Sequence, residues 1–596
     1  MSRMEVLESI GIQGNRTVTI VLAKNQKRIE RRLEVKSVRF PRTILIMIIL
    51  CLMFTACSLN PTQGVTTTSP TTSPTTSSTT SSSASPTTTA TQTTQTTAPM
   101  ELDILGQGAW SIPYEEWTNY PTYNAMADLF VQAGLKLNFE VITREQYPTV
   151  VQTRMAAGVD LPDIVNLSPL DTTTALNLAE QGIILDVKPL LKEFGSGSIE
   201  KFWEDYKFAL KLSTAPNGSV YWFVGFSRFE IESKPGTLAY STLAPQIRLD
   251  WLEKTALKPP ASIEEFKNCL ETFRKEDCNG SGVEDEIMLF DPTSFQNGVA
   301  QWFGLVPEVS YTNLENGKVM SPWLQDGIDE YFAYAKSLVD AELIDVSLIG
   351  APWEQIEQKT LDNKVSSFYG YTLESREAQM TDIEGAKYQS VDPLQAVAGI
   401  TPAVVAETSE IILGSWGITR DCQDKKAAIR FFEVVFSPEY CQLDAWGREG
   451  EEFEIRDGVK HMTEKFGRWE QTATGDMLAL GRSFTDSVLP WVQNLSLEGQ
   501  LDGIEEYKKV WQLKYNDYHP RFCGGNQLAL PDFEQANRKA ELFNNISTYS
   551  SESASKLATG DIPLSELPKV IAELKNLGLE ELMQIDQVLF DKYNSN

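Results

Sequence analysis

Residues 135–167 read LKLNFEVITREQYPTVVQTRMAAGVDLPDIVNL, and this stretch decides the fold. The pattern predicts a strand over 135–142, a helix over 147–157 and a second strand over 161–167. Strands that alternate with helices in this way indicate an α/β lobe with a largely parallel sheet.

Two earlier elements extend the same alternation, a strand at 102–105 and a helix at 121–133. In open α/β sheets, ligands bind beyond the carboxyl ends of the strands. We therefore expect Trp110 and the loop 166–171, which includes Asp171, at the rim of a binding site.

An apolar segment with a basic flank precedes the folded part. Residues 44–57 read ILIMIILCLMFTAC, and Arg39 and Arg42 lie just before them. The apolar run is too short to span a bilayer as a helix, and the basic flank is typical of an export signal. The end of the run resembles a bacterial lipobox, in which Cys57 is acylated and becomes the first residue. We expect a signal peptide over 1–56, with the true start further into the sequence.

Residues 57–100 predict a lipidated cysteine followed by a disordered tether. Between 66 and 97, 25 of 32 residues are Ser or Thr, and no residue from 58 to 100 is charged. Such a stretch cannot bury enough apolar surface to offset the entropy of ordering it. The tether would hold a domain away from the outer face of the cell membrane, as in a Gram-positive lipoprotein anchored by palmitate.

The remaining residues are too many for one core, so two lobes are expected. The predicted boundaries place 101–235 and 406–490 in the first lobe, and 236–405 and 491–596 in the second. Further helices are predicted at 263–273, 424–436, 549–557, 564–577 and 579–593, which makes the carboxyl terminus helical.

Charge and histidine content exclude several functions. The formal net charge is −29, and it becomes −35 once residues 1–56, with ten Lys/Arg and four Glu, are removed. This balance argues against nucleic acid as a partner. The chain has two histidines, His461 and His519, so Ser-His-Asp catalysis and His-rich zinc sites are not expected.

The segment 277–286 has the spacing of a calcium loop. Calcium loops place oxygen ligands at positions 1, 3, 5, 7 and 9 and glycine at position 6. Position 12 is Met288, so Glu286 at position 10 would supply the bidentate carboxylate. The alternative is a solvated acidic turn. The candidate ligands are Asp277, Asn279, Ser281, Val283 through its carbonyl, Asp285 and Glu286.

Aromatic residues are the candidates for ligand binding, because sugar rings stack on indole and phenol rings while their hydroxyls need polar partners. The chain has 13 Trp, most of which are expected in the core. The candidates in predicted loops or crossings, with two polar residues, are Trp110, Trp222, Trp302, Tyr371, Trp416, Asp171 and Arg248.

Together these segments resemble family 1 of the extracellular solute-binding proteins of bacterial ABC importers, and most closely its LipO and alginate-binding lipoprotein group. The resemblance runs from Leu102 to the end. Ser281 and Cys278 stand where family members usually carry Asn and Pro. The quoted motifs are IRLDWLEK (247–254), the 262–286 helix and loop, WGI (416–418), AAIRFF (427–432), WGREG (446–450), TY (548–549) and DKYN (591–594).

The resemblance implies a two-lobe periplasmic-binding-protein fold of type II, with lobes joined by crossing strands and a structural Ca²⁺ in the 277–286 loop. It implies a monomeric binding protein, not an enzyme, that hands an oligosaccharide to membrane permease subunits. Two alternatives remain: a ligand sensor for a histidine kinase, and a cell-surface glycoside hydrolase.

Overall fold

The structure is a computed structural model that describes residues 8–12, 16–20, 98–108, 114–230, 243–307, 309–371, 380, 383–405, 410–463, 488–496, 511, 514–515, 517–524 and 528–595. The predicted signal segment 44–57 and nearly all of the tether lie outside these residues. Residues 1–94 and 95–596 form separate units. In the first unit, β1 (Glu8–Ile12) and β2 (Arg16–Ile20) form an antiparallel hairpin. Among the described helices, none combines the length and the apolar character needed to cross a membrane.

The first lobe is built on a six-stranded sheet. Strand β3 pairs in parallel with β4 and with β5, as the alternation predicts. Strand β14 is antiparallel to both of its neighbours, so the sheet as a whole is mixed. Its order is β17 (Val492–Ser496), β6 (Phe223–Glu230), β14 (Glu410–Ile418), β5 (Ile164–Asn166), β3 (Met100–Gln107) and β4 (Leu135–Ile142).

Helices bury their apolar faces against this sheet. Phe432 of α13 stacks on Phe223 of β6, with ring centroids 3.9 Å apart, and Phe431 stacks on Phe130 of α2. Each such buried side chain contributes about 1.5–3 kcal/mol to stability. The helices are α2 (Pro121–Gln132), α3 (Tyr147–Ala157), α4 (Thr172–Glu180), α5 (Val187–Phe194), α6 (Ser198–Asp205), α7 (Lys207–Ser213), α13 (Lys425–Val435) and α14 (Pro438–Trp446). A hairpin of β15 (Phe453–Arg456) and β16 (Val459–Met462) follows α14.

The second lobe has two four-stranded sheets and its own core. The first has the order β12 (Tyr388–Ser390), β7 (Leu243–Arg248), β11 (Val365–Tyr371) and β8 (Ile287–Met288). The second has the order β10 (Lys318–Met320), β9 (Tyr311–Asn313), β18 (Arg521–Cys523) and β13 (Val404–Val405). Its helices are α8 (Leu249–Lys254), α9 (Ile263–Lys275), α10 (Val299–Trp302), α11 (Ile328–Asp340) and α12 (Trp353–Leu361).

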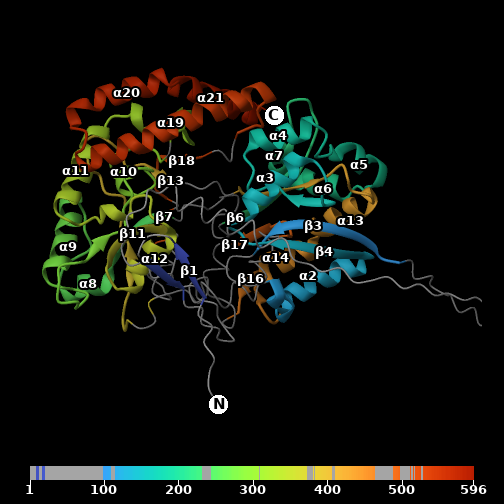
Figure 1. Cartoon of the computed structure of the whole chain (residues 1–596), viewed down its shortest axis with the longest axis horizontal. Coiled ribbons are helices and arrows are strands. Elements are labelled where there is room, and N and C mark those ends of the chain that lie inside the picture. Colours follow the sequence, from blue (N-terminus) through green and yellow to red (C-terminus); the bar gives the residue numbers. More distant parts are fainter. Residues whose placement is uncertain are drawn as a thin grey trace, which may run out of the picture. The chain divides into compact units, whose positions relative to one another are not determined.

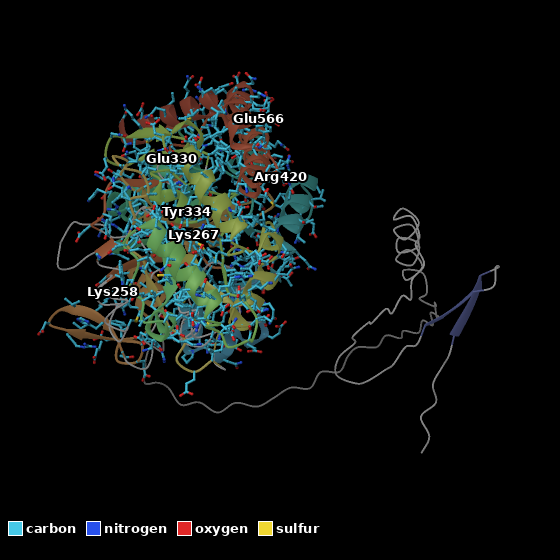
Figure 2. All side chains as sticks on the ribbon, turned by 90° about the vertical axis from the view of Figure 1, so that its left-hand side faces the viewer. Lys258, Lys267, Glu330, Tyr334, Arg420 and Glu566 are labelled. Atoms are coloured by element: carbon cyan, nitrogen blue, oxygen red, sulfur yellow. The ribbon has the colours of Figure 1, made fainter. Side chains whose placement is uncertain are left out.

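Helix α9 begins where the sequence predicts, with Ser262 accepting a hydrogen bond from the Glu265 backbone. The Glu265 carboxylate accepts from the backbone of Ala261. Figure 2 labels Lys267 on α9 beside Tyr334 on α11; the Tyr334 hydroxyl donates to the Ile263 carbonyl. These contacts fix α9, and therefore the loop that follows it, against the rest of the lobe.

The carboxyl terminus consists of α19 (Phe533–Thr559), α20 (Leu567–Asn576) and α21 (Leu579–Ser595), shown in red in Figure 1. Helix α19 begins 16 residues before the predicted helix at 549–557 and joins both cores. Ala536 belongs to the core of the first lobe, whereas Leu542 and Ile546 belong to the core of the second. Its start is held to the first lobe by the Thr173 hydroxyl, which donates to the Ala536 carbonyl at 2.9 Å.

Strand β17 differs from the predicted boundaries. The sequence division places residues from 491 onward in the second lobe, but β17 pairs in parallel with β6 of the first sheet. The first sheet therefore extends to Ser496, and later segments, such as the start of α19, still pack against the first lobe.

Candidate functional site

Among the described elements, the chain changes lobe after β6, before β14 and after β17, and α19 later contacts both cores. The strand ends at these three crossings lie at one edge of the first sheet, because Glu410 is paired with Arg228, and Ser496 with Glu230. In the second lobe, β7 starts at Leu243 and is paired there with the end of β11 at Tyr371. These strand ends define the edge at which a ligand would meet both lobes.

The second lobe carries aromatic and polar side chains beside this edge. Tyr515 packs against Ala244 of β7 and Val404 of β13, the two strands that adjoin crossings. Its hydroxyl donates to the carbonyl of Val391 at 2.5 Å. We call Asp392, Trp511, Lys514, Tyr515 and Tyr518 the Asp392 cluster.

Asp392 is the polar centre of this cluster. Its carboxylate accepts from the Tyr518 hydroxyl at 2.5 Å and from the Lys514 ammonium at 2.6 and 2.8 Å. Burial, followed by the hydrogen bond to Asp392, raises the pKa of Tyr518, so the phenol stays protonated and remains a donor. The Lys514 ammonium also lies 4.4 Å from the centre of the Trp511 ring.

A second polar pair lies at the same edge. The Gln301 amide of α10 donates to the Tyr369 hydroxyl of β11 at 3.0 Å. Gln301 also lines a small cavity together with Tyr515, so this pair and the Asp392 cluster are neighbours. Of the residues that the sequence argument named, Trp302 lines this same cavity, and Tyr371 lies two residues after Tyr369 on β11. The argument did not name Gln301, Tyr369 or the residues of the Asp392 cluster.

In the first lobe, the predicted loop 166–171 lies at the end of β5. The Asn166 side chain accepts from the backbone and hydroxyl of Ser168, which shapes the turn. Asp171 is exposed and caps α4, accepting from the Thr174 backbone at 2.9 Å and its hydroxyl at 2.6 Å. Burial opposes ionisation of Asp171, but these hydrogen bonds outweigh it and lower its pKa. Its role toward a ligand remains a prediction.

Three of the predicted tryptophans lie in the cores. Trp222 and Trp302 are 5% and 1% exposed, and Trp302 packs edge-on against Phe266. Trp416 is fully buried in the first sheet, and its indole nitrogen has no hydrogen-bond partner within the part of the chain that the structure describes. These positions fit packing better than ligand stacking. Trp110, Cys57 and the side chain of Tyr371 lie outside the described residues.

Arg248 is at the opposite end of β7 from the crossing at Leu243. It is 1% exposed, pairs with both oxygens of Asp250 at 2.6–2.8 Å, and donates to Asn363. Its guanidinium also stacks on Trp251, 4.0 Å from the ring centre. This arrangement anchors α8 to the sheet. It occupies the Arg248 guanidinium at the end of β7 away from the crossing, and a role of Arg248 toward a ligand remains a prediction.

The predicted calcium loop connects α9 to β8 and is held by internal hydrogen bonds. The Asn279 amide donates to Asp285, and the Ser281 hydroxyl donates to Asp285 and to the Val283 carbonyl. Hydrogen bonds therefore link four of the six predicted ligand residues, namely Asn279, Ser281, Val283 and Asp285. A fifth, Asp277, accepts from the Gly282 backbone in the same loop.

Two carboxylate oxygens in this loop have no partner. Within the described part of the chain, Asp277 Oδ1 and Glu286 Oε2 are buried and make no hydrogen bond, and Glu286 is 1% exposed. Burial raises the pKa of Glu286. Burial also opposes ionisation of Asp285, but bonds from Asn279, Lys364 and Ser281 outweigh it and lower its pKa. Buried, unpaired carboxylate oxygens are costly, and a hard cation that prefers oxygen ligands would satisfy them.

No group of three His, Cys, Asp or Glu side chains converges as a ready metal site anywhere in the described ranges. Half of the predicted ligand set consists instead of amide, hydroxyl and carbonyl oxygens, from Asn279, Ser281 and Val283. The residues present therefore fit a calcium ion by their donor chemistry.

A hollow of about 500 Å³ lies elsewhere on the first lobe. Trp203, Leu191 and Lys211 are among the residues that line it, all from α5, α6 and α7. These helices carry none of the crossing strand ends, so we do not assign the ligand to this hollow.

Comparisons with known proteins identify relatives. No family model matches the chain. It is 23% identical over 461 residues to the fructooligosaccharide ABC transporter substrate-binding protein FusA of Streptococcus pneumoniae, covering 73% of this chain and 81% of that protein. It is also 23% identical over 232 residues to lipoprotein LipO of Bacillus subtilis, covering 37% of this chain and 45% of LipO.

Solved structures show the same fold. FusA in complex with kestose has a TM-score of 0.66 at 17% identity and covers 83% of this chain and all of that chain. A human-milk-oligosaccharide (HMO) binding protein of Bifidobacterium longum infantis has a TM-score of 0.62 at 18% identity, over 83% of this chain and 99% of that chain. Alginate-binding protein AlgQ2, solved without calcium ion, has a TM-score of 0.61 at 17% identity, over 84% of this chain and all of that chain.

The fold is therefore the two-lobe fold of periplasmic-binding-protein-like solute-binding proteins, as the sequence predicts. Within that class, the resemblance to the substrate-binding lipoproteins of ABC transporters is confirmed by FusA and LipO.

Proposed function

We propose that this chain is the extracellular substrate-binding lipoprotein of an ABC importer. It captures an oligosaccharide between its lobes, closes on it and delivers it to permease subunits in the membrane. The observation that carries this proposal is the Asp392 cluster, which combines an indole, two phenols and a carboxylate at the edge where the chain crosses between lobes.

The relatives support the same class of ligand. FusA is named for fructooligosaccharides and was solved with kestose, and the Bifidobacterium protein is named for HMO binding. The named relatives are binding proteins, and we propose that this chain likewise binds without catalysing a reaction, as a monomer. The lipid on Cys57 and the tether would keep it at the outer face of the cell membrane.

The 277–286 loop is proposed to hold a structural Ca²⁺. Asp277, Asn279, Ser281, the Val283 carbonyl, Asp285 and Glu286 would bind the ion, whose charge would compensate the clustered carboxylates and tie α9 to β8. A FusA variant described as an EF-hand mutant and the calcium-free AlgQ2 structure support the idea that such proteins use calcium loops.

Binding is tested by calorimetry of the purified chain with kestose, longer fructooligosaccharides, HMO and alginate oligosaccharides. Micromolar or tighter binding, with no hydrolysis product of the sugar in the calorimeter sample, supports the proposal. Product formation would instead identify a glycoside hydrolase, and the absence of binding to every sugar in the panel would refute sugar capture.

Trp511→Ala is expected to weaken oligosaccharide binding about tenfold, because the ring provides the stacking surface of the cluster. Calorimetry measures the change. Trp511→Phe, which keeps a ring, should recover most of the affinity. Phe543→Ala removes a ring that is 44% exposed on α19 and should leave affinity unchanged. Equal losses in Trp511→Ala and Phe543→Ala would contradict the assignment of the site.

A further inference from the structure

We propose that Asp392 and Lys514 form a self-neutralising pair that makes this site select uncharged sugar rings over anionic ones. The inference rests on the proposed function, because it concerns the ligand of the same site. It predicts that discrimination against anionic sugars weakens when the carboxylate of Asp392 is replaced by an amide.

The geometry of the pair keeps the two charges together. The Lys514 ammonium contacts both oxygens of Asp392, at 2.6 and 2.8 Å. The Tyr518 hydroxyl fixes the carboxylate from another side, at 2.5 Å. The side chains of Lys514 and Asp392 are 43% and 44% exposed, so a ligand can reach both of them.

Lys514 is also held from the other side, because its ammonium lies 4.4 Å from the centre of the Trp511 ring. A cation over an indole is stabilised by about 0.5–1 kcal/mol at an exposed site. If Lys514 moved away to meet an anionic ligand, it would lose this contact and leave Asp392 without its counter-charge.

The pair retains hydrogen-bonding capacity while carrying no net charge. A carboxylate has about four acceptor positions, of which Tyr518 uses one on Oδ1 and Lys514 one on Oδ2. An ammonium has three donors, of which the hydrogen bond to Asp392 uses one. Acceptor and donor positions therefore remain for neighbouring hydroxyls of a sugar ring.

An anionic ring would fit this arrangement poorly. The carboxylate of the sugar would have to approach the Lys514 ammonium beside the negative charge of Asp392. The repulsion between these like charges disfavours binding. The pair thus acts against uronates while presenting ordinary donors and acceptors to neutral sugars.

A purely structural role for the pair would give different behaviour. Tyr515 already ties the same two segments together through the Val391 carbonyl, so loss of the pair alone should not unfold the lobe. A structural role would lower affinity for all sugars alike or change only the melting temperature. Selectivity is therefore the informative measurement.

The test is calorimetry of the purified chain and its Asp392→Asn variant with kestose and with trigalacturonate. Asparagine keeps the shape and one acceptor oxygen but leaves Lys514 as an unpaired cation. We expect Asp392→Asn to bind trigalacturonate at least tenfold more tightly than the wild-type chain does, and the ratio of trigalacturonate affinity to kestose affinity to rise with it. The gain should shrink between 0.05 and 1 M salt, because partly exposed charges are screened.

Asp340→Asn is the matched control. Lys336 and Asp340 form a pair of similar length, 2.6 Å, and similar exposure on α11, which carries no member of the cluster. It changes the net charge of the chain equally and should leave the affinity for trigalacturonate unchanged. Lys514→Met is the second variant. It should bind trigalacturonate more weakly than the wild-type chain does, because the Asp392 carboxylate then has no Lys514 cation beside it.

The outcomes separate the two proposals. An unchanged trigalacturonate affinity in Asp392→Asn, beside intact oligosaccharide binding, overturns the role of the pair and leaves sugar capture standing. An equal gain in Asp340→Asn overturns it as well, because the effect would then come from net charge. A wild-type chain that binds no sugar of the panel overturns both proposals.

Discussion

Calcium is expected to raise the free energy of unfolding of this chain by about 2.7 kcal/mol when its free concentration is a hundred times its dissociation constant. The reason is the pair of buried oxygens, Asp277 Oδ1 and Glu286 Oε2, for which no hydrogen bond exists in the described part of the chain. A bound cation satisfies them in the folded state only. Denaturant unfolding of the chelated and calcium-loaded chain measures the difference.

The control for this prediction lies within the loop. Asp277→Asn combined with Glu286→Gln should abolish the calcium-dependent gain in the free energy of unfolding. Glu284→Gln changes an exposed carboxylate at position 8, outside the predicted ligand set, and should retain the gain. If Glu284→Gln loses as much of the calcium-dependent gain as the double variant does, the ion is held by the overall negative charge of the loop and the assigned ligands are wrong.

The 277–286 loop could be proposed as a calcium site from sequence because all of its candidate ligands lie within ten consecutive residues. The same locality explains why the strand at 135–142 and the helix at 147–157 are predicted with the bounds found in the structure. Local signals also mark the end of the helix, where Gly158 adopts a left-handed conformation.

Helix α19 shows where local patterns fail. It has 27 residues, and eight of them are buried, two of which are serines. Its position depends on contacts with both lobes, from Ala536 in one core to Ile546 in the other. No window of the sequence contains those partners.

The binding site was predicted less well, for a related reason. Tryptophan in a predicted loop or crossing does not reveal whether the ring faces a ligand or a core, and Trp222, Trp302 and Trp416 face the cores. A usable signal was present in residues 511–518, where three aromatic side chains recur at spacings of four and three. They follow the last crossing, but their partner Asp392 is more than a hundred positions earlier in the chain.

Trp302→Ala is expected to lower the free energy of unfolding by about 3–5 kcal/mol, the cost of deleting a large core side chain. Trp302 is 1% exposed, its ring centroid lies 4.8 Å from that of Phe266, and it belongs to the core of the second lobe. Unfolding in denaturant measures the loss. Trp302→Phe, which leaves a smaller cavity, should lose less and supplies a folded variant if the alanine variant does not fold.

The comparison with Trp511→Ala separates packing from binding. Trp511 is only partly buried, so its removal should change the free energy of unfolding far less than the removal of Trp302 while weakening the oligosaccharide more. A Trp302→Phe variant with native stability and more than tenfold weaker sugar binding would restore Trp302 as a ligand residue. Stability lost at Trp302 and affinity lost at Trp511 would place the ligand against the Asp392 cluster, because there a partly exposed indole lies beside polar side chains at the crossing edge.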